Sequence, residues 1–187
     1  MTDAPTLTIF EGHERLLTAP LQDVLTFLKS REQATSQPLL TFDDQTGRQT
    51  DFDLRGSLED VLERYVPTPA KAGPGRPRLG VVAREVTLLP RHWEWLEGQR
   101  GGASAALRRL IDEARKADPD GERRQQAQTA TDRFLGVIGG DLPGYEDATR
   151  ALYAGDGQAF ESQLQNWPED LRIHALYLAS SAFVEKA

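Results

Sequence analysis

Residues 84–115 read REVTLLPRHWEWLEGQRGGASAALRRLIDEAR, and this stretch carries the clearest fold signal in the chain. Residues 81–89 predict a strand, and Pro90 then stands where helices begin. Glycines at positions 98, 101 and 102 end this first helix. Ser104 is a good N-cap for a second helix, whose apolar face comprises Leu107, Leu110, Ile111 and Ala114. The stretch therefore predicts a strand followed by two helices.

This order of elements over residues 81–117 resembles the ribbon-helix-helix DNA-binding fold. In that fold, the strands of two chains pair into an antiparallel ribbon that lies in the major groove. Free backbone N–H groups at the start of the second helix hold a phosphate. The resemblance implies a homodimer that binds DNA, with Gly102, Ala103 and Ser104 at the phosphate.

The register of the predicted strand remains open. In one register the outward residues are 84, 86 and 88, which are mostly apolar. In the other they are Ala83, Glu85 and Thr87, which would present a carboxylate to the DNA. A shift of one residue moves every side chain to the opposite face. Because neither face suits base reading well, a strand-helix-helix used for dimerisation or core packing stands as the alternative.

Residues 67–80 hold four prolines and three glycines, which predicts a linker. Within it, residues 74–78 read PGRPR and resemble part of an AT-hook. The Gly-Arg-Pro core of an AT-hook lies in a narrow A·T minor groove, where the negative potential attracts arginine. The arginine expected before Gly75 is missing. A flexible basic linker without DNA contact is the other interpretation.

Charge is distributed unevenly along the chain. The net charge is −7 overall, with −6 in residues 1–70, +4 in residues 71–124 and −5 in residues 125–187. A basic middle segment permits a focused site for an anion, although it could equally attract the acidic ends of the same chain. The DNA contacts predicted from the sequence are Arg76, Arg78, Arg84, Thr87, Arg91, Arg100, Gly102, Ser104 and Arg108.

The flanking segments predict an α+β fold class. Residues 1–66 indicate a small domain of order ββαββα, and residues 118–187 indicate a helical C-terminal part. The strand signals in the first segment are 6–10, 15–18 and a hairpin of 39–42 with 52–54. Helices are expected after Pro20 and after Ser57, which is followed by Asp60 at the third helical position.

The sequence contains no recognisable catalytic motif, and we predict that the protein is not an enzyme and needs no cofactor or metal. There is no cysteine, and His13, His92 and His174 lack metal-ligand spacing, so each is expected at the surface or in a local hydrogen bond. The spacing of the four aspartates in the predicted hairpin does not fit a calcium loop. A solvated sheet face is predicted for them: Asp43, Asp44, Asp51 and Asp53.

The remaining features concern location and family. No apolar run approaches the roughly 18 residues that a membrane helix needs, and residues 1–10 do not resemble a signal peptide, so a soluble, cytoplasmic protein is expected. The whole chain resembles the uncharacterised bacterial DUF2239 family in residues 75–115, in FDDQTGR at 42–48 and in DLPGYEDATRALYAGD at 141–156. That family has no established activity. The leading hypothesis is a dimeric DNA-binding protein with a regulatory role, and the alternative is a protein-interaction or adaptor module without DNA binding or catalysis.

Overall fold

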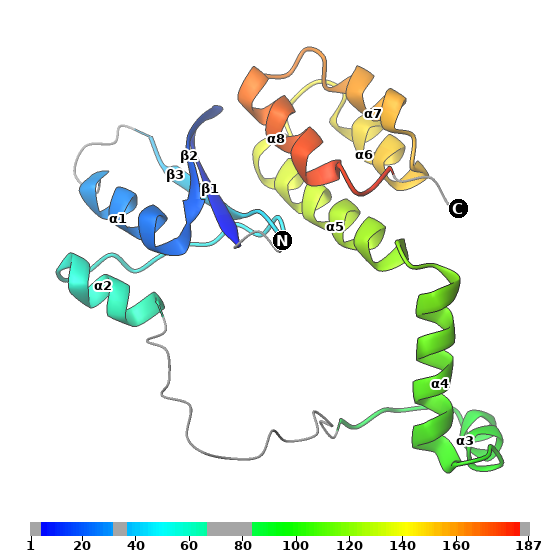
Figure 1. Cartoon of the computed structure of the whole chain (residues 1–187). Coiled ribbons are helices and arrows are strands. Elements are labelled where there is room, and N and C mark those ends of the chain that lie inside the picture. Colours follow the sequence, from blue (N-terminus) through cyan, green and yellow to red (C-terminus); the bar gives the residue numbers. More distant parts are fainter. Residues whose placement is uncertain (1–4, 32–36, 67–83, 184–187) are drawn as a thin grey trace. The chain divides into compact units, whose positions relative to one another are not determined.

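The structure is a computed structural model that describes residues 5–31, 37–66 and 84–183. Within these ranges the fold is mixed α+β, with a three-stranded antiparallel sheet and eight helices (Figure 1). The chain divides into two compact units. The main unit joins Met1–Thr68 with Glu122–Ala187, and the central unit is Pro69–Gly121. The strands near the N-terminus and the helices near the C-terminus therefore belong to one unit.

The sheet of the main unit has the order β2-β1-β3. Strand β1 is Thr6–Glu11, β2 is Glu14–Pro20 and β3 is Leu39–Asp43. A tight turn with Gly12 at a φ of 58° joins β1 to β2, a conformation that favours glycine. The first two strands confirm the sequence prediction. Because side chains alternate along a strand, Leu7 and Ile9 lie on one face of the sheet and Thr8 and Phe10 on the other.

Helices α1 (Leu21–Arg31) and α2 (Leu58–Tyr65) form a helical layer on one face of the sheet. Val24 and Leu28 of α1 are buried together with Leu7, Ile9 and Ala19 of the sheet. Helix α2 begins as predicted at a capping box. The Ser57 hydroxyl accepts the Asp60 N–H at 3.2 Å, and the Asp60 carboxylate accepts the Ser57 N–H at 2.7 Å.

The opposite face of the sheet packs against the C-terminal helices. These are α5 (Gly121–Ile138), α6 (Tyr145–Ala154), α7 (Gly157–Gln163) and α8 (Glu169–Ala179). Phe134 of α5 meets Phe10 and Phe42 of the sheet, with ring centroids 5.5 and 4.9 Å apart. The sheet is therefore enclosed between two helical layers, and its second face completes the larger of the two hydrophobic cores.

The predicted ββαββα order is wrong in its fourth strand. Residues 50–56 form no strand. After β3 the described chain pairs with the sheet at one isolated antiparallel bridge, between Phe42 and Gln49. The segment is held by α2 instead of by the sheet. The Asp53 N–H donates to the Tyr65 hydroxyl at 2.7 Å, and the ring of Phe52 packs edge-on against that of Tyr65. The observed order in this part of the chain is ββαβα.

The described part of the central unit contains two helices, α3 (Pro90–Glu97) and α4 (Gly102–Ala117). Pro90 opens α3 as predicted. The predicted strand is not observed over residues 84–89, and residues 81–83 lie outside the described ranges. A strand requires a partner for its backbone groups, and no described segment of this chain pairs with residues 84–89.

The start of α4 also differs from the prediction. The helix begins at Gly102, two residues before Ser104, and its N-cap is Gly101 with a φ of 88°. Gly102 also has a positive φ, 74°. Two consecutive glycines allow this left-handed turn, whereas Ser104 lies inside the first turn of the helix and its side chain does not cap it.

None of the helices in the described ranges combines the length and the apolar character needed to cross a membrane.

Candidate functional sites

The predicted DNA contacts that the structure describes all lie in the central unit. Arg84 and Thr87 precede α3, Arg91 is in its first turn, and Arg100 is in the turn that leads to α4. Each arginine of the predicted set within residues 84–121 is exposed. Gly102, Ser104 and Arg108 are on α4, and Arg76 and Arg78 lie outside the described ranges.

The predicted phosphate anchor at the start of α4 needs one correction. The Gly102 N–H donates to the Gln99 carbonyl oxygen at 3.0 Å, so it is not available to a phosphate. The N–H groups of Ala103 and Ser104 lie in the first turn of the helix, where no earlier helical carbonyl can accept them. These two groups and the helix dipole are what the turn can offer an anion.

The charge of the described central unit is balanced. Residues 84–121 contain seven Arg and Lys and seven Asp and Glu, so the net positive charge of residues 71–124 comes from residues 71–83 and 122–124. Arg108 donates to the Ser104 carbonyl oxygen at 3.1 Å, and Arg109 lies 3.8 Å from the Glu113 carboxylate. Arg84, Arg91 and Arg100 form no ion pair with any described residue.

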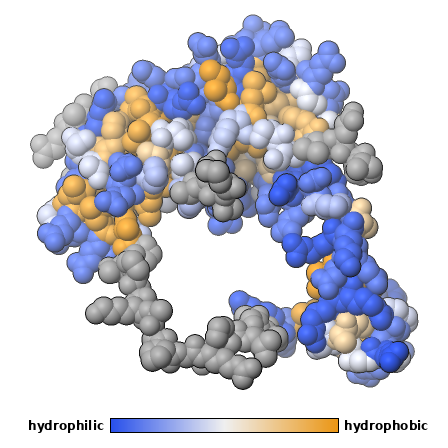
Figure 2. Space-filling model, viewed as in Figure 1, coloured by the Kyte–Doolittle hydropathy of each residue, from blue (hydrophilic) through white to orange (hydrophobic). Residues whose placement is uncertain are grey.

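The described central unit buries little of its apolar surface. Leu96 and Ala106 are buried, whereas Trp95 and Ile111 are 52% and 56% exposed. Apolar residues are visible on the surface of this unit in the space-filling view (Figure 2). Trp95 does not share the buried position of its neighbour Leu96. The residues of the predicted apolar face of α4 are not buried by the described elements: Leu107 is half-buried, and Leu110, Ile111 and Ala114 are exposed. The large exposed apolar residues of the unit are Val86, Leu89, Trp95, Leu110 and Ile111.

A second candidate site lies in the main unit, at Asp44. The prediction of a solvated face is wrong for this aspartate, whose side chain is 2% exposed. Asp44 follows β3 two residues after Phe42, and therefore lies on the face that packs against the C-terminal helices. Its Oδ2 accepts the Thr6 hydroxyl at 2.6 Å, and its Oδ1 accepts the Thr8 hydroxyl at 2.8 Å.

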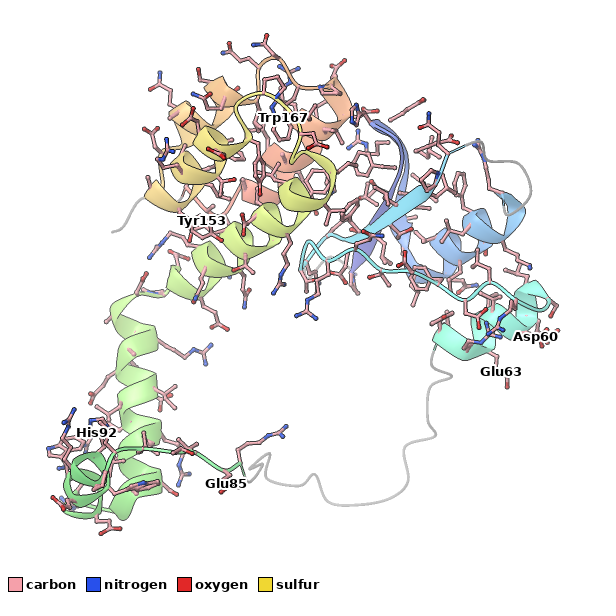
Figure 3. All side chains as sticks on the ribbon, turned by 180° about the vertical axis from the view of Figure 1, so that it is seen from behind. Asp60, Glu63, Glu85, His92, Tyr153 and Trp167 are labelled. Atoms are coloured by element: carbon pink, nitrogen blue, oxygen red, sulfur yellow. The ribbon has the colours of Figure 1, made fainter. Side chains whose placement is uncertain are left out.

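His174 of α8 lies beside this carboxylate, and the prediction of a surface position or a local hydrogen bond is wrong for it. The side chain is 2% exposed and packs between the rings of Phe10 and Phe134, at 5.4 and 4.7 Å. Its Nε2 is 3.6 Å from the Asp44 Oδ1, beyond hydrogen-bond distance, and has no hydrogen-bond partner within the part of the chain that the structure describes. By contrast His92 is on the surface of α3, as predicted (Figure 3).

Burial shifts both ionisable groups toward their neutral forms. It lowers the pKa of His174 to about 4, with a further contribution from the positive charge of Arg15. Burial also raises the pKa of Asp44, although the hydroxyls of Thr6 and Thr8 oppose that shift by donating to the carboxylate. His174 is consequently neutral at neutral pH and does not compensate the charge of an ionised Asp44.

Helical spacing could have located His174 in the core. Leu171, His174, Ala175 and Leu178 follow one another at i, i+3, i+4 and i+7, and all four are buried. The histidine therefore occupies an apolar-face position of α8. No comparable local signal exists for Asp44, because its partners Thr6 and Thr8 lie 38 and 36 residues away in sequence.

Asp44 lines a cavity of about 700 Å³. The polar residues around this cavity are Thr6, Arg15, Thr18, Asp44 and Gln45, and Pro5, Leu16, Leu17 and Tyr177 complete its lining. An adjoining cavity of about 500 Å³ shares Asp44, Gln45 and Tyr177 with it. In the described ranges no three His, Asp or Glu side chains are grouped so as to hold a metal ion.

Comparison with known proteins identifies the family of the chain. The model of a family described as an uncharacterized protein conserved in bacteria (DUF2239) matches residues 6–179. No curated protein and no solved structure matches the chain. The family match spans the described strands, both candidate sites and the last helix, and it confirms the resemblance seen in the sequence. The chain therefore belongs to the DUF2239 family of bacterial proteins.

Proposed function

We propose that this protein is a dimeric DNA-binding protein whose DNA-binding surface is formed by two copies of the central unit. The observation that carries the proposal is the incomplete core of that unit. Over residues 84–121 only Leu96 and Ala106 are buried apolar residues, while five large apolar side chains are exposed. A small unit gains most of its stability from apolar burial, so exposed apolar surface of this kind favours association.

A second copy of the chain is the occupant that fits this face. Residues 84–89 have no strand partner among the described residues and carry two of the exposed apolar side chains, Val86 and Leu89. The same segment of a second chain could pair with them in an antiparallel ribbon and satisfy the backbone groups of both copies. The exposed faces of the two α4 helices, with Leu110 and Ile111, would then cover each other.

Three features of the central unit support DNA as the ligand of such a dimer. Arg84, Arg91 and Arg100 are exposed and form no ion pair with described residues, so they are available for phosphates. The first-turn N–H groups of Ala103 and Ser104 can hold one phosphate per chain. The linker adds Arg76 and Arg78, which supply part of the positive charge that residues 84–121 lack.

The balanced charge of residues 84–121 favours one competing function, a protein-interaction or adaptor module. A surface with seven basic and seven acidic residues beside an exposed tryptophan also suits a protein partner. The two functions differ in whether the dimer binds DNA, and the experiments below distinguish them.

The first experiment measures the oligomeric state. We expect light scattering of the full chain to give twice the monomer mass, and Ile111→Asp to shift the protein toward monomer by placing a charge in the apolar interface. Val137→Asp is the matched control, because Val137 is a similarly exposed residue on α5 in the main unit, and it should leave the mass unchanged. A wild-type monomer at tens of micromolar protein would contradict the dimer.

The second experiment measures DNA binding by mobility shift at several salt concentrations. With four to six phosphate contacts per dimer, the log–log slope of affinity against salt should be roughly −4 to −5, because each contact releases condensed counterions. Arg91→Ala with Arg100→Ala should weaken binding to every duplex and flatten that slope.

The matched control for this experiment is Arg48→Ala with Arg150→Ala, which removes two exposed arginines of the main unit and should leave binding unchanged. If a stable dimer binds no duplex at about 50 mM salt and micromolar protein, DNA binding is excluded and the adaptor function stands.

A further inference from the structure

In the cavity beside Asp44, the hydrogen-bond geometry determines which hydroxyl groups donate and which accept. Each threonine hydroxyl has a single proton to donate. The Thr8 hydroxyl donates to Asp44 Oδ1 at 2.8 Å, so in its 2.9 Å contact with Thr18 the donor must be Thr18. The Thr6 hydroxyl likewise donates to Asp44 Oδ2. Thr6 and Thr18 both line the cavity, and neither has a proton left for a ligand.

An ionised Asp44 therefore makes this part of the cavity wall accept hydrogen bonds only. The lone pairs of the Thr6 and Thr18 oxygens are what remains for a ligand, and they favour a group that carries several N–H donors. A cationic donor is favoured further, because the buried carboxylate forms no ion pair with any lysine or arginine of the described residues. His174 lies 3.6 Å from this carboxylate, and its buried Nε2 has no hydrogen-bond partner among the described residues.

Arg15 supplies a positive charge at the cavity, opposite to that of Asp44. This residue is exposed on β2, lines the cavity and forms no ion pair with any described residue. The backbone N–H of Arg15 donates to the Asp170 carboxylate at 2.9 Å, which ties this end of β2 to α8. The hydrogen bond fixes the backbone of Arg15 and leaves its guanidinium free to bind a carboxylate with two parallel hydrogen bonds.

The cavity also has an apolar surface, in addition to its hydroxyl groups and Arg15. The ring of Tyr177, which is 57% exposed, lines the cavity together with Pro5. The volume of about 700 Å³ lies within the usual range of small-molecule sites. A pure cation would be repelled by Arg15 and a pure anion by Asp44, whereas a molecule with both charges satisfies the two.

We propose that this cavity binds a small zwitterion of the amino-acid type with an apolar side chain. Its ammonium group lies against the Thr6 and Thr18 hydroxyls, its carboxylate pairs with Arg15, and its side chain packs on Tyr177. The site belongs to the main unit and is independent of the proposed DNA-binding surface.

The test uses L-phenylalanine and two analogues, each lacking one charge. Phenylalaninamide has no carboxylate, and N-acetylphenylalanine has no ammonium group. We expect phenylalanine to shift the amide NMR signals of Thr18, Gln45 and Tyr177 in the full-length protein in a saturable manner. Each analogue should bind at least about tenfold more weakly. The absence of saturable shifts with millimolar phenylalanine, or equal affinity for all three compounds, would overturn the proposal.

Variants then identify the contacting residues. Thr18→Val keeps the shape of the side chain but removes the acceptor, and Arg15→Ala removes the cation, so each should weaken phenylalanine binding by about tenfold. The matched controls are Thr26→Val on α1 and Arg150→Ala on α6, both exposed and away from the cavity lining. Unaltered affinity in the Thr18 and Arg15 variants, with the urea midpoint also unaltered, would show that phenylalanine does not occupy this site.

Discussion

Phe134→Ala is expected to lower the free energy of unfolding of the main unit by about 3–5 kcal/mol. Phe134 is fully buried, and its ring meets those of Phe10, Phe42 and His174 at centroid distances of 5.5, 4.9 and 4.7 Å. These partners come from β1, β3 and α8, so one side chain contacts three elements that are far apart in sequence. Truncation would remove these contacts and leave a cavity that close-packed neighbours fill only in part.

Urea denaturation followed by circular dichroism measures this loss. The control is Val137→Ala on the same helix, because Val137 is 47% exposed and its truncation should cost under about 1 kcal/mol. A single transition that shifts as a whole in the Phe134 variant is expected, since the sheet and the C-terminal helices share one core. Equal, small losses in both variants would mean that the sheet and α5 are not packed as described.

Gly47→Ala is the second substitution for which we expect a large effect, a loss of about 2–4 kcal/mol. Gly47 has a φ of 65°, and an added Cβ would lie 1.8 Å from the Ala130 carbonyl oxygen on α5. The obstacle is backbone, which cannot rotate aside as a side chain can. Left-handed backbone accounts for about 1–2 kcal/mol of the loss and the steric overlap for the remainder.

Gly155→Ala separates these two contributions. Gly155 has a similar φ of 73°, but no atom of the described residues lies within 4 Å of the added Cβ, so this variant has only the conformational cost. The same urea measurement should therefore rank Gly47→Ala clearly below Gly155→Ala in stability. Equal losses would contradict the close approach of the turn after β3 to α5, which the hydrogen bond from Arg133 to the Thr46 carbonyl oxygen also indicates, at 3.1 Å.

The sequence by itself determined the elements whose signals are local. Ser57 and Asp60 form a capping box within one turn of helix, and Pro90 begins α3 because its fixed φ suits the first helical position. The helix expected after Pro20 is α1, and its apolar residues Val24, Leu25 and Leu28 are buried. The sequence also placed the candidate DNA-binding arginines of residues 84–121 on or beside α3 and α4, because the residues around these arginines carry the signals for both helices.

The tertiary structure alone decided which residues meet. Phe52 and Leu54 have the pattern of a strand, yet they pack beside α1 and α2 because Tyr65 and the helical layer offer a better partner than the edge of the sheet. Asp44 is followed in sequence by the exposed polar residues Gln45 and Thr46, but it is buried because Thr6, Thr8 and α8 close over it. The absence of strand structure in residues 84–89 has the same origin, since pairing depends on a second segment. Local propensity is encoded within a few residues, whereas burial depends on surfaces that only the folded chain brings together.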